Sequence, residues 1–139
     1  MAVPAAKVFF EEVRAAFDSV AARLGLEGPV ETERVLPVAT YTRGVLEYET
    51  YLDQREASLE IHVGVRTKPT LFTAGVEPLA IAAGIVERRG GVSFSAHNLK
   101  QMKKSLAGQL RYVELLHPLL AGDTDSAVEL MRKADAREW

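Results

Sequence analysis

Two neighbouring segments between residues 44 and 66 alternate apolar and polar side chains along their whole length. Because successive side chains of a strand point to opposite faces, this period predicts two strands that each have one apolar face. The apolar rows are Leu46, Tyr48, Thr50 and Leu52 in the first segment, and Ala57, Leu59, Ile61, Val63 and Val65 in the second. The polar run 53–56 between them predicts a hairpin with a loop of about two to four residues.

The register of this hairpin decides which face of the sheet is buried. Pairing Leu52 with Ala57 brings both apolar rows to the same side. A slip of one residue would move one row into water, whereas a slip of two would keep both rows on the same face. We therefore predict a sheet with one dry face and one hydrated face.

Long helices are predicted before and after the strands. In the range 3–24 an apolar stripe recurs at steps of three and four residues, and Gly25 follows as a C-terminal cap. The members of this stripe are Phe10, Val13, Phe17, Val20 and Leu24. Asn98 is a favoured N-cap residue for a second helix at 99–120, in which Pro118 should cause a kink or the end of the helix. Its apolar stripe consists of Leu99, Met102, Leu106, Leu110, Val113 and Leu120.

Shorter elements are expected in the rest of the chain. Further strands are predicted at 35–41, 70–74 and 92–96, and further helices at 77–89 and 125–137. Residues 28–34 are polar and include a proline, so we expect a loop there. Pro37 indicates an edge position or a bulge in its strand, because proline has no N–H to donate to a neighbouring strand.

Together these elements predict an α+β fold. A one-sided sheet has to bury its apolar row against partner helices. We therefore expect an antiparallel meander of four to five strands, covered on one face by the N-terminal helix and by the C-terminal helices. The chain has 139 residues, of which 47% are apolar, so residues 1–139 are expected to form a single globular domain.

Composition narrows the classes of function. The absence of cysteine excludes disulfides, thiolate metal sites and thiol catalysis, and it is easiest to reconcile with a reducing, cytoplasmic location. The N-terminal stretch lacks both the pattern of a signal peptide and that of a membrane span, so we expect no membrane association. A formal charge of −2 gives no global field toward nucleic acid.

The most distinctive polar residues lie on the predicted hydrated face of the hairpin. Glu47, Glu49 and Tyr51 alternate on one strand, and Glu60 and His62 alternate on the next, so all five should point the same way. Three carboxylates and an imidazole suit Mn²⁺ or Zn²⁺, or a carboxylate base with a raised pKa. A solvated sheet face is the simpler interpretation. We predict no bound metal and no cofactor.

A second group of residues is basic. Arg88, Arg89, Lys100, Lys103 and Lys104 occur within a stretch, 88–113, that has no acidic residue. The three lysines fall in the first turns of a helix, where the macrodipole disfavours cations and attracts anions, so the group is a candidate anion patch. A solvated helix face is the simpler interpretation. Nucleic-acid binding is not favoured, because aromatic residues are not interleaved with the basic ones.

Three classes of function remain. We favour a non-catalytic protein-binding module, such as a small chaperone, an inhibitor or an immunity-type protein that caps a protein partner. The chain lacks a catalytic motif, and its one-sided sheet has strand edges that also suit homodimerisation. Tyr51 amid three glutamates forms an acidic patch suited to a basic partner. The alternatives are a small-molecule binder and a metal-assisted or acid-base enzyme that uses the hydrated-face carboxylates. The small-molecule pocket would lie between sheet and helices, opened by Ala80, Ala82, Ala83 and Gly84.

Overall fold

The computed structural model describes residues 2–139, in which six strands form one antiparallel sheet and four helices accompany it. In chain order the elements are α1 (Ala6–Leu24), β1 (Glu27–Glu33), β2 (Pro37–Arg43), β3 (Leu46–Asp53), β4 (Ser58–Thr67), β5 (Thr70–Gly75), α2 (Val76–Ala82), α3 (Leu99–Leu120), α4 (Thr124–Lys133) and β6 (Arg137–Glu138). The order in the sheet is β1-β2-β3-β4-β5-β6, so each strand pairs with the next one in the chain. The predicted α+β meander is confirmed, with more strands than the four to five expected.

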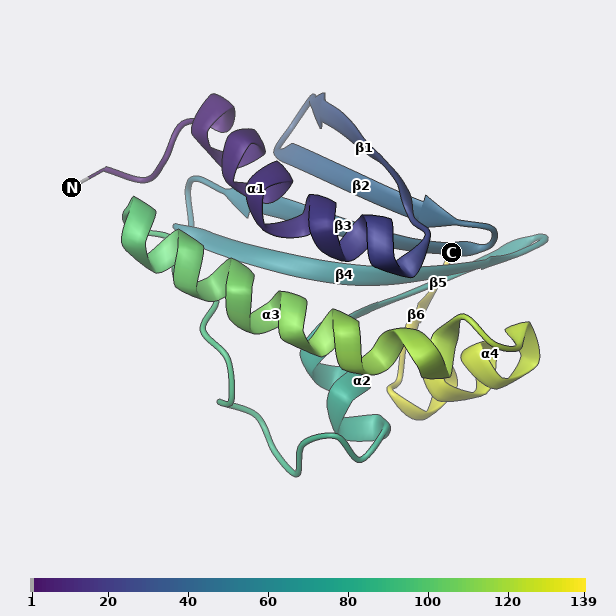
Figure 1. The fold of residues 1–139 in the computed structure, drawn as a ribbon. Helices are drawn as coiled ribbons and strands as arrows, with labels where there is room; N and C mark the ends of the chain where they lie inside the picture. Colours follow the sequence, from purple (N-terminus) through teal and green to yellow (C-terminus); the bar gives the residue numbers. More distant parts are fainter. Residues whose placement is uncertain (1) are drawn as a thin grey trace.

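One face of the sheet supplies the core. Figure 1 shows α1 and α3 lying side by side across the strands, with α2 and α4 placed beyond α3. All four helices contribute apolar side chains to the same core as the dry face of the sheet, among them Phe17, Leu79, Leu106 and Met131. Each such side chain, once fully buried, contributes about 1.5–3 kcal/mol through the hydrophobic effect.

The central hairpin has the predicted faces but a different register. The apolar rows of β3 and β4 are buried, while the residues between them are half-buried or exposed, except for Gly64, which is buried. Leu52 pairs with Leu59, two residues further along than the expected Ala57. Ala57 instead has a left-handed backbone, φ 51°, and closes the loop 54–57. This is the slip of two that the alternation does not distinguish, because it leaves every side chain on its original face.

The C-terminal cap predicted for α1 and the N-terminal cap predicted for α3 are both confirmed. Gly25 has φ 72°, and the N–H of Leu26 donates to the carbonyl of Ala21 at 2.8 Å, which caps α1. The Asn98 side chain accepts from the Gln101 N–H at 3.0 Å and caps α3. The expectation that Pro118 ends α3 is wrong, because Pro118 lies inside the last turn and its missing N–H costs one hydrogen bond near the terminus.

Three predictions about the sheet are wrong. The expected loop 28–34 belongs to β1, an exposed edge strand whose glutamates hide the alternation that a half-buried strand would show. Pro37 opens β2, an interior strand, and proline is tolerated at the first residue of a strand. The segment 92–96 is not a strand, although Ser95 forms an isolated bridge with Ser58.

Both shorter helices end earlier than expected. The predicted helix 77–89 is α2, which stops at Ala82 because Gly84 takes a left-handed backbone with φ 75°. The predicted helix 125–137 is α4, which stops at Lys133 and leaves Arg137 and Glu138 to pair with β5 as β6. An aspartate caps the last helix, since the Asp123 side chain accepts from the Asp125 N–H.

A buried glutamine completes the half of β4 that β5 does not reach. Gln109 of α3 is fully buried, and its Oε1 accepts from the Ile61 N–H at 2.8 Å. Its Nε2 donates to the Leu59 carbonyl at 2.8 Å and to the Ser93 carbonyl at 3.1 Å. One amide therefore satisfies backbone groups that a neighbouring strand would otherwise pair, and it joins α3 to the sheet.

Replacing Gln109 with leucine should destabilise the fold strongly. The Ile61 N–H and the Leu59 carbonyl would remain buried without partners, at about 1–3 kcal/mol each, so we expect a loss of about 2–4 kcal/mol in the free energy of unfolding. Urea denaturation measures this change. The control is Gln101→Leu, which removes one exposed hydrogen bond to His97 and should cost less than about 1 kcal/mol. Equal losses in the two variants would contradict the role of Gln109.

Candidate functional site

The sheet face that α1 and α3 leave uncovered carries the predicted polar residues together. We call Glu47, Glu49, Tyr51, Glu60 and His62 the polar-face cluster. The strand register places Glu49 opposite His62 and Tyr51 opposite Glu60, so these five side chains share one face as the alternation predicts. All are half-buried or exposed.

Three members of the cluster form one hydrogen-bonded unit. The Tyr51 hydroxyl donates to a carboxylate oxygen of Glu60 and lies 3.3 Å from Nε2 of His62. His62 Nε2 lies 3.6 Å from the same oxygen of Glu60, and the two rings meet edge to face with centroids 5.2 Å apart. These contacts hold the Tyr51 ring upright on the sheet.

The contacts within this unit favour one protonation state of Tyr51 and one of Glu60. The pKa of the Glu60 carboxyl is lowered, first by the His62 imidazole 3.6 Å away and further by the hydrogen bond from Tyr51, despite partial burial. The pKa of the Tyr51 phenol is raised, first by burial and then by the Glu60 carboxylate. Tyr51 therefore remains a neutral donor and Glu60 a carboxylate, which is the opposite of what a tyrosinate nucleophile and a carboxylic acid donor would require.

Two glutamates remain outside this unit. Gly64 lies opposite Glu47, and a Cβ at Gly64 would come within 2.7 Å of Glu47 Cγ, so the glycine makes room for Glu47 to lie across β4. Glu47 Oε1 lies 3.7 Å from the Arg66 guanidinium. The pKa of Glu49 is raised by burial and by the Glu47 carboxylate, and His62 lowers it only in part. Negative charge is therefore incompletely balanced around Glu49.

The cluster offers neither a metal site nor a deep cavity. Among residues 2–139, no group of three or more histidine, aspartate and glutamate side chains is arranged to hold a metal ion. His62 lines a hollow at the rim of the sheet, together with residues of β5, α2 and the C-terminal segment. The hydrogen bonds of the cluster run between its own members rather than toward an open central position.

The predicted basic residues lie in separate places. Lys100, Lys103 and Lys104 are exposed in the first turns of α3, and Lys103 Nζ lies 3.8 Å from Glu12 of α1. Arg88 and Arg89 belong to the exposed loop 83–98, which Figure 1 shows running from α2 to the start of α3. Arg89 lines a hollow together with Pro78 and Lys133. None of the three lysines of α3 lines this hollow.

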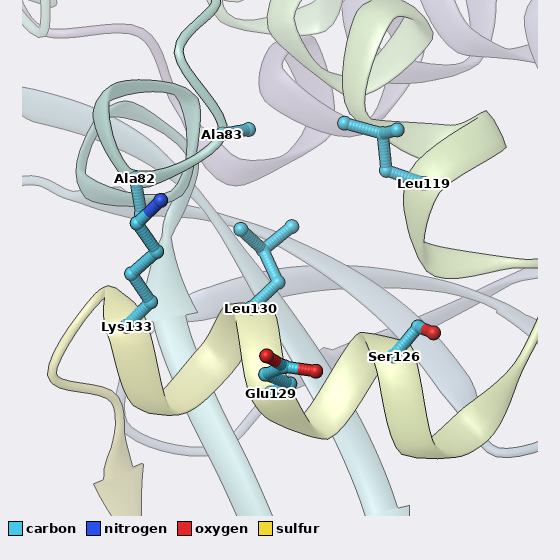
Figure 2. Close-up of a pocket in the computed structure, with 7 residues that line it drawn as sticks. All are labelled: Ala82, Ala83, Leu119, Ser126, Glu129, Leu130 and Lys133. Carbon is cyan, nitrogen blue, oxygen red and sulfur yellow. The ribbon is translucent and has the colours of Figure 1, made fainter.

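Sequence reasoning missed a series of hollows on the helical side. The first is lined by Ala82, Ala83, Leu119, Ser126, Glu129, Leu130 and Lys133, and Figure 2 shows these side chains around it. The small residues Ala82 and Ala83 thus open a space as expected, but between helices rather than between sheet and helices. Ala80 is part of the core. The sequence signal was Leu115 and Leu119, two leucines four residues apart and off the buried stripe of α3.

A buried tyrosine–histidine pair lies on the opposite, dry face of the sheet. The Tyr48 hydroxyl is 2.7 Å from Nδ1 of His117, and both residues are buried. Nε2 of His117 is also buried and has no hydrogen-bond partner in residues 2–139. His117, which lies in the last turn of α3, therefore contacts a side chain of the sheet through Nδ1. Burial, together with the positive charge of Arg43, lowers the pKa of His117.

Comparison of the chain with family models, with curated proteins and with solved structures finds no match. No helix within residues 2–139 is both long and apolar enough to cross a membrane.

Acidification should destabilise the protein through His117. The unfolded chain takes up a proton at its ordinary pKa near 6.5, whereas folded His117 resists protonation, so the unfolded state binds more protons below that pH. We expect the free energy of unfolding to fall as the pH drops from 7 through about 6. His117→Gln should flatten this slope in urea titrations at several pH values, and an unchanged slope would contradict the assignment.

Removing the Tyr51 hydroxyl should raise the pKa of Glu60. Tyr51→Phe deletes the hydrogen bond from the Tyr51 hydroxyl that favours the Glu60 carboxylate, and it leaves the ring in place. Carbon-detected NMR titration of the side-chain carboxyl measures the change. The carboxyl of Asp123, at the N-cap of α4, serves as the internal control, because its pKa is lowered first by its hydrogen bond with Ser126 and should keep that shift in the variant. An unchanged or lowered Glu60 pKa would contradict the described hydrogen bond.

Proposed function

We propose that this protein is a non-catalytic module that binds a protein partner through the polar-face cluster, and that the bound segment of the partner is basic. The supporting observation is that Glu47 and Glu49 lie two residues apart on one strand, on a sheet face that α1 and α3 leave uncovered. Burial, and after it the Glu47 carboxylate, raises the pKa of Glu49. A nearby cation would relieve this like-charge crowding and favour the ionised form of Glu49. An arginine or lysine side chain supplies such a cation at a protein interface.

The hydrogen-bonded unit gives the proposed interface a fixed aromatic anchor. Tyr51 is held by Glu60 and His62, so little side-chain entropy is lost when a partner packs against its ring. Tyrosine is enriched at the centre of protein interfaces for this reason and for its large contact area. A cation approaching Glu49 can also lie over the neighbouring aromatic face.

The protonation states of the cluster weigh against the catalytic alternative. A general base needs a pKa near the operating pH, yet Glu60 has a lowered pKa. Tyr51 has a raised pKa and serves as a donor. Among the cluster carboxyls, only the pKa of Glu49 shifts in the direction that a base requires. Glu49 lies on an open sheet face, however, and does not line the hollow that contains His62. Recognition uses all five residues, whereas acid-base chemistry would use one.

A charge-matched pair of variants tests the proposed interface. Glu47→Gln with Glu49→Gln removes the uncompensated charge, and the control, Glu11→Gln with Glu87→Gln, removes two exposed carboxylates elsewhere. The probes are fluorescent peptides of equal length, one rich in arginine and tyrosine and one rich in aspartate and tyrosine. Anisotropy at low and high salt measures their binding.

We expect the native protein to bind the basic peptide and to lose affinity as salt rises. The double substitution at Glu47 and Glu49 should weaken binding about tenfold, which corresponds to about 1.4 kcal/mol, and the control should stay within about twofold. No binding of the basic peptide, or equal effects of the two double variants on its binding, would overturn the proposed role of the polar-face cluster.

A further inference from the structure

Three hollows on the surface join into one groove. The first, between α2, α3 and α4, shares Ala82 and Lys133 with a second hollow that also contains Ile81 and Arg89. This second hollow shares Pro78, Ala134 and Asp135 with a third, which reaches His62 and Trp139. Because each neighbouring pair has lining residues in common, the hollows adjoin one another in a row from Leu119 to the rim of the polar-face cluster. We call this row the α2/α4 groove.

One end of the groove is apolar. Leu119 is 48% exposed although it belongs to a helix whose other face is core, and Leu130 lies across the hollow from it. Figure 2 shows Leu130 pointing up from α4 toward the space that separates α2 from Leu119, with Ala83 behind. The alanines of α2 leave this space open where longer side chains would fill it. An aliphatic side chain from outside would bury apolar surface on both leucines.

The middle of the groove is basic. Arg89 and Lys133 both line the second hollow, and within residues 2–139 neither forms an ion pair. Asp135 lies in the same hollow, and Glu129 lines the first, so cations and acids are both present. Arg137, in the third hollow, stacks over the Trp139 ring at 5.0 Å. With three cations and one acid along the second and third hollows, the groove is complementary to an acidic side chain.

The volumes of the three hollows favour a peptide, whose successive side chains can each occupy one hollow, over one compact ligand. The three hollows have volumes of about 320, 280 and 340 Å³, in order along the groove. Each alone is near the lower limit of the roughly 300–1,000 Å³ typical of small-molecule sites. A peptide presents successive side chains at about 3.3 Å per residue, so it can occupy neighbouring hollows with different chemistry.

We propose that the α2/α4 groove binds a short peptide segment of a partner protein, with an aliphatic side chain between Leu119 and Leu130 and an acidic side chain against Arg89 and Lys133. This proposal deepens the proposed function, protein recognition, and it rests on that function. The groove and the polar-face cluster use different residues apart from His62. The polar-face cluster would contact a basic portion of the partner, and the groove would contact an acidic portion.

A phage-displayed library of random dodecapeptides tests the groove with isolated peptides. Native protein should enrich sequences in which an aliphatic residue is followed or preceded within a few positions by aspartate or glutamate. Arg89→Glu with Lys133→Glu should invert the charge preference, so that lysine and arginine replace the acids. The control, Lys100→Glu with Lys104→Glu, changes the net charge equally at exposed positions outside the groove and should keep the native preference. If the inverted variant fails to fold, Arg89→Gln with Lys133→Gln should abolish the preference for acids.

A second comparison isolates the apolar end. Leu119→Asp should lower the affinity for the enriched peptides about tenfold, whereas Leu115→Asp, exposed on the preceding turn and outside the lining, should stay within about twofold. Enrichment of no common pattern, or the same peptides bound by native and charge-inverted protein, would overturn the proposal. The Glu47→Gln, Glu49→Gln variant should still select the aliphatic-acidic peptides and should lose only basic peptides that the native protein binds through the polar-face cluster, so failure of the groove and failure of the cluster are distinguished.

Discussion

The amide of Gln109 is the contact on which the arrangement of helices and sheet depends. β4 is the longest strand, and β5 pairs only with its second half, from His62 onward. At Leu59 and Ile61 the outer backbone groups face α3 instead, and a single buried side chain meets both. The 93–96 segment adds a further bond, from the Leu59 N–H to the Phe94 carbonyl. The register of α3 against the sheet is therefore set by hydrogen bonds as well as by apolar packing.

The spacing of apolar residues was sufficient to predict the helical and sheet layers, but it did not predict the edge strands of the sheet. The alternation through β3 and β4 fixes which side chains are buried, and Gly25 and Asn98 mark helix ends through backbone chemistry that depends on few neighbours. β1 was missed because an edge strand over solvent needs no apolar row. β6 has two residues, which is too short for any period to be read. The two-residue shift at Leu59 leaves the pattern unchanged and so could not be predicted.

The candidate sites also differ in how far the sequence predicts them. Side chains two apart on paired strands must share a face, so Glu49 and His62 could be brought together from sequence alone. The groove is different, because Leu119, Arg89 and Lys133 come from α3, a loop and α4. Nothing local in the sequence indicates that these three segments meet. The breadth of the groove depends on α2 ending at Ala82, where we expected a longer helix. Tyr51 is an intermediate case. The face on which its side chain lies was predictable, but the sequence did not indicate that Glu60, rather than Glu47 or Glu49, would accept its hydrogen bond.

The two borders of the sheet differ in their openness to another strand. β6 pairs with Phe72 and Thr73 and partly closes the β5 border, where the Trp139 indole also donates to the Thr73 hydroxyl at 2.9 Å. β1 forms the other border and carries Glu27, Glu31 and Glu33, of which Glu31 is paired with Arg14. If two copies met along β1, the remaining carboxylates would approach one another at neutral pH and repel. The acidic border thus discourages sheet-to-sheet aggregation while leaving its backbone groups accessible to a strand of opposite charge.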